Sequence, residues 1–192
     1  MRKSKQEAAE TRQRIISAAA VEFRRNGISH TGLSDLMAAA GLTHGGFYRH
    51  FESKDQIVAE ACRSAVRSMV DTFAAAAAGK SARRRLRAAV ARYLSTDHRD
   101  DHARGCPLAA LGSEIARCDE GVRSAATDGF LRLVEIIAAQ YEGTRPDLAK
   151  RRALAAASMM IGALTMSRIV TDPELSFEIL SQANRYLADK TN

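Results

Sequence analysis

Residues 43–54, THGGFYRHFESK, bring hydrogen-bonding side chains together at close spacing. They carry a hydroxyl, two imidazoles, a phenol and an ammonium group, at Thr43, His44, His50, Tyr48 and Lys54. Such groups suit the phosphate oxygens and base edges of nucleic acids. The sequence has no phosphate-binding glycine loop, nucleophile elbow or paired-carboxylate motif. We therefore expect a binding protein that is not an enzyme and has no catalytic residue.

The residues before this stretch supply the helices that would position it. An apolar stripe at helical spacing runs through Leu33, Leu36, Met37 and Ala40. Gly41 follows where a helix commonly ends, and Thr43 can cap the next helix. A helix, a short turn with glycine and a second helix with a polar outer face are typical of a helix-turn-helix. That motif places its second helix in the major groove of DNA.

A helix is also expected ahead of this motif. Residues 11–26 are amphipathic, with Ile15, Ile16, Ala19, Ala20 and Phe23 on one stripe. Thr31 either caps the second helix or points toward phosphate. Residues 1–10 are a polar, mostly basic arm that either frays or contacts the DNA.

The rest of the chain predicts further helices and no strands. Ser53 is a good N-cap with Gln56 in the capping-box position, so a long helix should run from there to about residue 78. Others are expected over residues 81–95, 106–118, 120–142, 148–170 and 174–188, with a charged connector at 97–104. The fold class is all-α with about nine helices. We divide the chain into an N-terminal three-helix helix-turn-helix domain, residues 1–52, and a C-terminal helical domain, residues 53–192.

Composition fits this prediction. The 192 residues are 46% hydrophobic, contain only 3 prolines and carry a formal charge of +7. Residues 1–54 hold nine Lys or Arg against five Asp or Glu, and such a basic surface suits phosphate binding. Three cysteines and a charged N-terminus argue against a secreted, disulfide-bonded protein. The longest uncharged run, residues 153–167, is shorter than the ~20 residues that cross a bilayer, so we expect a cytoplasmic protein with no membrane partner.

The helix expected over residues 148–170 is apolar nearly all round, which requires cover on every side. Its small residues Ala157, Gly162 and Ala163 allow another helix to approach closely. We expect the last two helices to form a homodimer face, as a four-helix bundle across a two-fold axis. The alternative is a central core helix in a monomer.

Four segments follow one another in a fixed order: TRQRIISAA at 11–19, FRRNG at 23–27, LSDLMAAAG at 33–41 and GFYRHFESK at 46–54. Their order and spacing resemble the TetR/AcrR family of one-component transcriptional regulators. The close resemblance covers about a quarter of the chain, and the rest is similar to the family only in its helical, Ala- and Leu-rich pattern.

The resemblance implies a homodimer that binds a double-stranded DNA operator and a small-molecule effector, most often as a repressor, with no cofactor. By similarity Thr43, His44 and Gly45 face the base edges, although many members have Lys or Arg where this chain has His44. By similarity Tyr48, His50 and Lys54 contact phosphates, and Thr31 lies at the DNA backbone. The alternative for Tyr48 and His50 is packing within the small core.

The C-terminal domain then becomes the ligand-binding and dimerisation domain. Candidate pocket residues are apolar and come from several helices: Cys62, Val66, Met69, Phe73, Leu111, Ile115, Phe130, Val134 and Met159. A pocket of this kind suits a small, mostly apolar or aromatic molecule. Each of these residues is also an ordinary core position.

Other chemistry is open at two places. His98, His102 and Cys106 stand four residues apart and could ligate zinc, although Gly105 and Pro107 interrupt a helix there, and no metal is expected. Cys106 could sense redox state from a helix N-terminus. The arginines of residues 83–92 suggest either nucleic acid or a solvated helix face. A ligand- or metal-binding helical protein that no longer binds DNA specifically is the alternative function.

Overall fold

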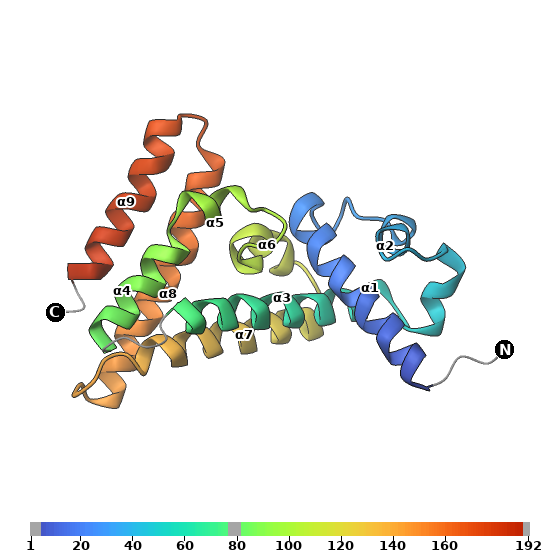
Figure 1. Cartoon of the computed structure of the whole chain (residues 1–192), viewed down its shortest axis with the longest axis horizontal. Coiled ribbons are helices and arrows are strands. Elements are labelled where there is room, and N and C mark those ends of the chain that lie inside the picture. Colours follow the sequence, from blue (N-terminus) through green and yellow to red (C-terminus); the bar gives the residue numbers. More distant parts are fainter. Residues whose placement is uncertain (1–4, 77–81, 190–192) are drawn as a thin grey trace.

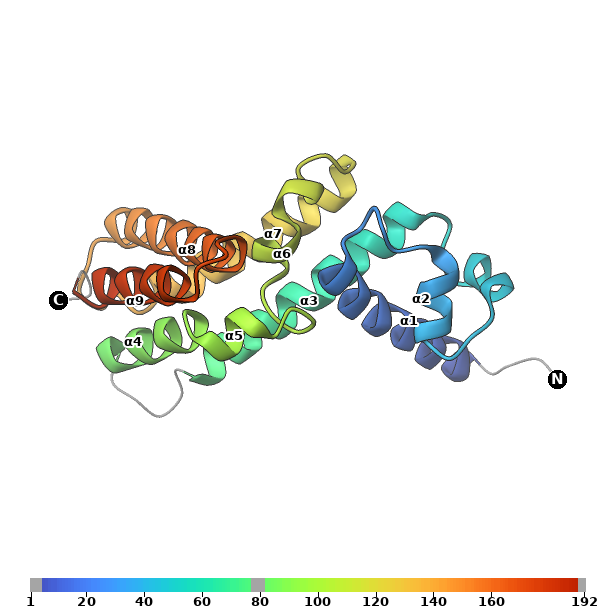
Figure 2. The same ribbon diagram turned by 90° about the horizontal axis from the view of Figure 1, so that it is seen from above.

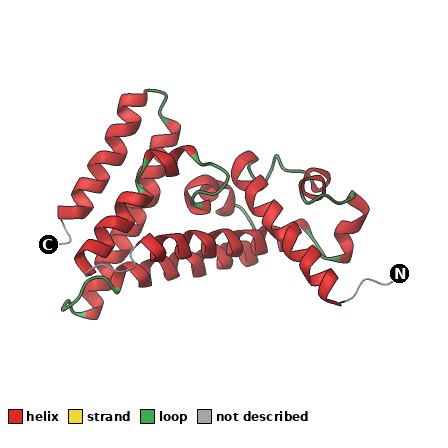
Figure 3. Ribbon diagram, in the orientation of Figure 1, coloured by secondary structure: helices red, strands yellow, loops and turns green. Residues whose placement is uncertain are grey.

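The computed structural model describes residues 5–76 and 82–189 of the chain. These residues form helices and turns with no strand among them, which confirms the all-α prediction (Figure 3). The first four residues, which include much of the predicted basic arm, lie outside the described residues. So do residues 77–81, where the long helix was expected to end.

The N-terminal unit consists of α1 (Lys5–Asn26), α2 (Leu33–Ala39) and the 3-10 helix η1 (His44–Arg49). α1 begins six residues before its predicted start, so residues 5–10 are helical and the arm predicted over residues 1–10 is wrong for them. The Thr11 hydroxyl donates to the Glu7 carbonyl within that added turn. The residues concerned, QEAAE, are mostly good helix formers with nothing to stop the helix.

Local capping explains where the next elements begin. Gln56 N–H donates to Ser53 Oγ at 3.1 Å, which confirms the predicted N-cap of α3. Thr43 precedes η1 but its side chain makes no capping hydrogen bond, so the predicted cap there is wrong. α2 starts from Gly32, whose N–H donates to the Asp35 carboxylate at 3.3 Å. A cap by Thr31, one of the two roles predicted for it, is not formed, because its hydroxyl donates to the Gly27 carbonyl.

The C-terminal helices lie close to their predicted places. They are α3 (Lys54–Ala76), α4 (Ala82–Tyr93), α5 (Thr96–Asp100), α6 (Pro107–Ile115), α7 (Glu120–Ala138), α8 (Pro146–Ile169) and α9 (Pro173–Asp189). The short α5 replaces part of the predicted connector, because Ser95 caps it by accepting a hydrogen bond from His98 N–H.

α3 is the rod that links the two ends of the molecule (Figure 1). One end of α3 packs against α1, and its length packs against α7. Gly129 permits this close approach, since a Cβ there would lie 2.3 Å from Val66 Cγ1. α8 and α9 lie side by side at the end of the molecule opposite α2 and η1, and α6 lies between the two ends (Figure 2).

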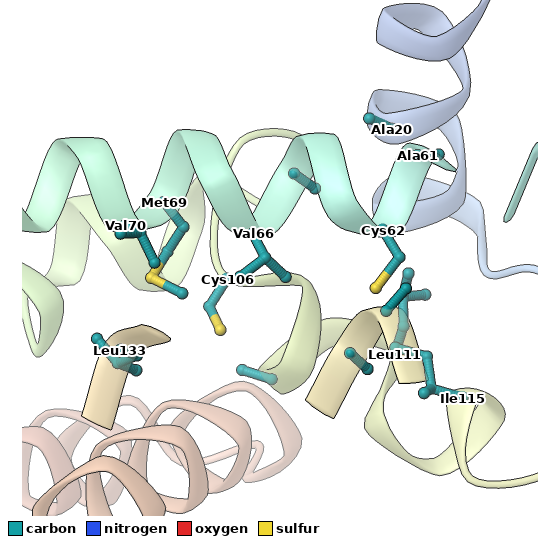
Figure 4. Packing of buried hydrophobic residues seen from close by; sticks show 14 of the residues in the cluster. Ala20, Ala61, Cys62, Val66, Met69, Val70, Cys106, Leu111, Ile115 and Leu133 are labelled. Atoms are coloured by element: carbon teal, nitrogen blue, oxygen red, sulfur yellow. The ribbon is translucent and has the colours of Figure 1, made fainter. Parts of the chain in front are cut away.

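A continuous apolar core joins these helices. Figure 4 shows side chains of α3 facing those of α6, α7 and the turn before α6, among them Cys62, Val66, Met69, Cys106, Leu111 and Leu133. All six side chains are at most 7% exposed. Burial of this kind is worth about 1.5–3 kcal/mol for each large apolar side chain, so α3 is held firmly along its length.

Candidate nucleic-acid interface and effector cavity

Two buried rings hold η1 against the rest of the N-terminal unit. Phe47 and Phe51 are 0% and 2% exposed, and their rings stack with centroids 5.4 Å apart. On the same inner side, a Cβ at Gly46 would be only 3.4 Å from Met37 of α2. Met37, predicted on the apolar stripe of α2, is 0% exposed and packs on this side with the two rings.

The opposite side of η1 faces solvent. Thr43, His44 and Gly45 are exposed, and Tyr48 is 68% exposed although its ring edge contacts Phe47. The Thr43 hydroxyl is not used as a cap. A Cβ at Gly45 would meet nothing within 4 Å, so the protein's own packing does not require glycine there. We call Thr43, His44, Gly45 and Tyr48 the outer face of η1.

Arg12 fixes the far end of η1. Its Nε donates to the His50 carbonyl at 3.2 Å, and its two terminal nitrogens bind both oxygens of Glu60 on α3. The same guanidinium lies 4.7 Å above the Phe51 ring. His50 and Lys54 are half-buried beside this joint. A single side chain of α1 therefore positions the last residues of η1 relative to the long helix.

Thr31 does not belong to this face. Its side chain is 1% exposed, and its hydroxyl donates to the Gly27 carbonyl at 2.6 Å. That bond closes the turn between α1 and α2, where Gly27 has φ +86°. The side chain is therefore a structural part of the turn, and we correct its predicted placement at the DNA backbone.

A cavity of about 400 Å³ lies where α1, α3, α4 and α5 meet. Its walls contain polar, charged and apolar groups: Arg24, Ser68, Met69, Thr72, Phe73, Ala89, Arg92, Tyr93, Asp97, His98, Asp101, Arg104 and Gly105. Only Met69 and Phe73 belong to the predicted pocket. The predicted apolar character of the pocket is therefore wrong for this cavity.

The other predicted pocket residues pack elsewhere. Cys62, Leu111 and Ile115 line a void of only about 10 Å³, roughly the room of one water molecule. Val66 and Val134 are 2% exposed and lie in the core, where Phe130 and Met159 are half-buried against it. These side chains fill the space between helices, so none of the seven lines the larger cavity.

Sequence reasoning missed the polar wall because it is formed by distant residues. Arg24 lies in the last turn of α1, and its Nη1 reaches the Gly105 carbonyl at 3.5 Å. Burial lowers the pKa of Arg24, but a guanidinium still remains charged. The sequence contained one signal for this wall: Arg24, one residue after Phe23, lies on the apolar stripe of α1.

His98 is fixed in the neutral form beside this wall. Its Nε2 accepts a hydrogen bond from Cys106 N–H at 2.9 Å, which leaves the proton on Nδ1, 2.7 Å from the Tyr93 carbonyl. Burial lowers the pKa of His98. Because both ring nitrogens are used, His98 joins α5 to the start of α6 and is not free to bind a metal.

The remaining metal and redox candidates find no support. Within the part of the chain that the structure describes, no group of three or more His, Cys, Asp or Glu could hold a metal ion. Cys106 is 0% exposed, and burial raises its pKa, which disfavours the reactive thiolate. Burial likewise raises the pKa of Cys62 to about 11.

A further contact joins α6 to the turn between α1 and α2. Glu114 of α6 accepts a hydrogen bond from Ser29 N–H at 2.8 Å. Burial alone would raise the pKa of Glu114, but hydrogen bonds from Ser29 and Ile28 outweigh it and leave the pKa below its usual value. The two parts are thus joined through α3, α6 and the Arg24–Gly105 contact.

Comparison with known proteins agrees with this architecture. Residues 15–61 match the family described as bacterial regulatory proteins, tetR family. Residues 82–175 match the C-terminal domain described as transcriptional regulator LmrA/YxaF-like. Together the two matches cover well over half of the chain. We also find no helix between residues 5 and 189, outside the undescribed 77–81, that is long and apolar enough to span a bilayer.

Individual relatives give the same result. The HTH-type transcriptional regulator AcrR of Shigella flexneri is 46% identical over 59 residues, or 31% of this chain, and the match spans only about a quarter of its length, 27%. An uncharacterized HTH-type transcriptional regulator of Mycobacterium tuberculosis is 29% identical over 173 residues, which cover 84% of this chain and 86% of the relative.

The fold is shared over its whole length with solved structures. A TetR transcriptional regulator from Chloroflexus aurantiacus superposes with a TM-score of 0.79 at 29% identity, covering 96% of this chain and 95% of that chain. These relatives are named as regulators rather than enzymes, in agreement with the prediction that the chain is not an enzyme. The helix-turn-helix, the helical C-terminal domain and these matches together show that the chain belongs to the TetR/AcrR family of transcriptional regulators.

Proposed function

We propose that this chain is a DNA-binding transcriptional repressor that acts as a homodimer on a palindromic operator and is released by a small molecule. The observation that carries the proposal is the outer face of η1. It presents a free hydroxyl, an imidazole, an open glycine and a phenol to solvent, while Phe47 and Phe51 hold it rigidly from behind. Such a protein would work in the cytoplasm, where its operator lies.

On this proposal the residues of η1 divide their work. Thr43, His44 and Gly45 lead the element and face the base edges, where Gly45 lets the backbone approach closely. Tyr48, His50 and Lys54 contact phosphates on either side of the groove, which fixes the register without reading sequence. His44 Nδ1 lies 3.3 Å from Ser34 Oγ, so α2 helps to orient the imidazole.

The dimer is supported by an apolar surface at the opposite end of the molecule. Most of the exposed large apolar residues lie on α8 and α9: Leu148, Met166, Ile169, Leu175, Phe177 and Tyr186. Monomeric proteins rarely expose apolar groups in such density. A second copy packed against α8 and α9 would cover them and complete a four-helix bundle. The resulting two-fold axis would set two copies of η1 on two half-sites.

Release is supported by the cavity next to α1 and α3. Both helices belong to the path from the cavity to η1, since Arg24 lines the cavity and α3 begins directly after the helix-turn-helix. A molecule that binds better to a cavity with α1 and α3 displaced would shift the dimer away from the DNA-binding geometry. The mixed walls suit a molecule with a polar end rather than a wholly apolar one. The division into domains 1–52 and 53–192 remains part of the proposal.

A mobility-shift assay on the DNA upstream of the chain's own gene tests the proposal. We expect a complex that prefers this DNA over an unrelated duplex of equal length at about 0.15 M salt and weakens steeply as salt rises. The dimer should protect two half-sites about one or two helical turns apart in a footprint. Failure to prefer any segment of the upstream DNA would contradict the DNA-binding proposal.

A further inference from the structure

One buried polar group in the cavity wall has no hydrogen-bond partner. It is Arg24 Nε, in a residue that is 9% exposed. Burying a polar group without a partner is costly, so each such group in a folded protein needs an explanation. Arg24 lines the 400 Å³ cavity, which is large enough to hold a small organic molecule.

The acids of the cavity are already engaged with other arginines. Asp101 accepts a hydrogen bond from the Arg104 backbone N–H at 3.0 Å and one from Arg104 Nε at 3.2 Å, and Asp97 lies 3.6 Å from Arg92. Arg24 has no carboxylate within 4.0 Å among the described residues. With three arginines, two aspartates and a neutral His98, the cavity carries a net positive charge that is centred on its least exposed arginine.

The geometry of Arg24 favours an anion. Its Nη1 lies 3.5 Å from the Gly105 carbonyl, and its Nε is sealed from the cavity by neighbouring atoms. Nη2 is the guanidinium nitrogen left to face the cavity, and a charge-assisted hydrogen bond from it would hold a carboxylate oxygen. The remainder of the wall includes Met69, Phe73 and Ala89, which suit an apolar or aromatic body. A cation would find both aspartates paired, and a neutral molecule would leave Arg24 with only the longer-range attraction of Asp101.

We propose that this cavity binds a small organic carboxylate, with the carboxylate on Nη2 of Arg24 and an apolar body against Met69, Phe73 and Ala89. This inference deepens the proposed function and rests on it only for its regulatory consequence. Arg24 lies on α1, one helical turn before Gly27, and Gly27 begins the turn that leads to α2. The bound acid would therefore act directly on the helix-turn-helix unit as well as on α3.

Isothermal calorimetry without DNA tests the site with matched probe pairs. We use phenylacetate and 4-phenylbutyrate, each against its primary amide, which has nearly the same shape but no charge. At least one acid should bind about tenfold or more tightly than its amide, as expected for a charge-assisted hydrogen bond. Arg24→Gln should remove this preference while changing the affinity for the amide by less than about threefold.

Arg25→Gln is the matched control, because Arg25 is the next residue of α1 and its side chain is 57% exposed and paired with Glu22. It should leave the preference for the acid unchanged. Arg24→Lys keeps the charge but replaces the guanidinium with a shorter side chain that ends in an ammonium group, so it should retain only part of the preference. Thermal unfolding of each variant without ligand shows that the comparison is made on folded protein.

The inference is overturned if neither acid binds more tightly than its amide, or if Arg24→Gln keeps the full preference. These outcomes are separate from failure of the DNA-binding proposal, because calorimetry requires no operator. If the acid binds through Arg24 and lowers the affinity of the wild-type protein for its operator, the carboxylate site and the DNA-binding proposal are both supported. If operator binding is seen and no acid is preferred, only the carboxylate site is lost.

Discussion

The carboxylate of Glu114 lies 2.8 Å from the backbone nitrogen of Ser29 and accepts its hydrogen bond. Glu114 belongs to α6, and Ser29 belongs to the turn between α1 and α2. The bond is charge-assisted and satisfies a backbone N–H that no helix uses. It therefore ties the orientation of the helix-turn-helix to the position of α6.

Replacing Glu114 should loosen this joint. Glu114→Ala is expected to lower the free energy of unfolding by about 1–2 kcal/mol, and Glu114→Gln by less because it keeps an acceptor oxygen. Urea denaturation at neutral pH measures both changes. Asp128→Ala on the exposed side of α7 is the matched control, with an expected change of less than about 0.5 kcal/mol. If Asp128→Ala lowered the free energy of unfolding by the same amount, the effect would come from surface charge rather than from the Glu114–Ser29 hydrogen bond.

Gly27 should be more sensitive to substitution than a comparable glycine elsewhere. Gly27 and Gly143 have φ +86° and +72°, so alanine at either position costs about 1–2 kcal/mol in the left-handed region. A Cβ at Gly27 would also lie 2.9 Å from Glu114 Oε1, whereas a Cβ at Gly143 would meet nothing within 4 Å. Gly27→Ala should therefore cost about 1 kcal/mol more, because it pushes Glu114 away from Ser29.

A double-mutant cycle isolates that excess. In a Glu114→Ala background, Gly27→Ala should cost about as much as Gly143→Ala, since the crowded oxygen is gone. Denaturant titrations of the single and double variants provide the comparison. An undiminished excess in the double variant would show that the crowding comes from another neighbour.

Tyr48 and Thr43 should affect DNA binding in different ways. Tyr48→Ala is expected to weaken binding about tenfold on specific and unrelated DNA alike, because a phosphate contact reads no sequence. Tyr48→Phe, which keeps the ring against Phe47, should show most of this loss if the hydroxyl makes the contact. Thr43→Val should mainly reduce the preference for the operator. Competition mobility shifts measure all three, and an equal loss on every sequence from Tyr48 and Thr43 variants would contradict these roles.

His98 should make stability depend on pH. Its folded-state pKa is lowered by burial below the ordinary value of 6.5, and Arg92, Asp101 and Arg168 also face it. The unfolded chain therefore takes up the proton first. The stabilisation is complete above about pH 6.5 and is lost as the pH falls through the folded-state pKa. His98→Gln should flatten the curve of unfolding free energy between about pH 8 and pH 5. A curve unchanged by this substitution would place the titration at another histidine.

The apolar residues of α8 and α9 should control the oligomeric state. Phe177 and Ile169 are 60% and 62% exposed in the single chain. Phe177→Glu or Ile169→Glu would bury a charge in the proposed dimer face and should give monomers at concentrations of about 1–10 μM. Leu131→Glu, at a 42% exposed position on α7, should leave the dimer intact. Sedimentation velocity separates the outcomes, and a wild-type monomer would remove the dimer proposal.

The sequence by itself determined the features that arise from neighbouring residues. The apolar stripes of α1, α2 and α3, the glycine at the end of α2 and the Ser53 cap with Gln56 all act within one or two helical turns. They were sufficient for the helical class, for most helix positions and for the outer face of η1. The local signals failed where two neighbours competed: the turn selected Gly32 with Asp35 as the start of α2 and used the Thr31 hydroxyl for its own closure.

Tertiary structure alone decided the cavity and its coupling to α1. Arg24 meets Gly105 across 81 positions of sequence, and Glu114 meets Ser29 across 85. No periodicity records such pairs, because they depend on how α3, α6 and α1 cross. The apolar residues predicted as a pocket were instead drawn together to fill the core, since close packing of Val66, Leu111 and Val134 removes apolar surface from water. The space that stayed open is lined by charged groups. Burying a charged group is costly unless a partner compensates its charge, so these walls do not close on one another.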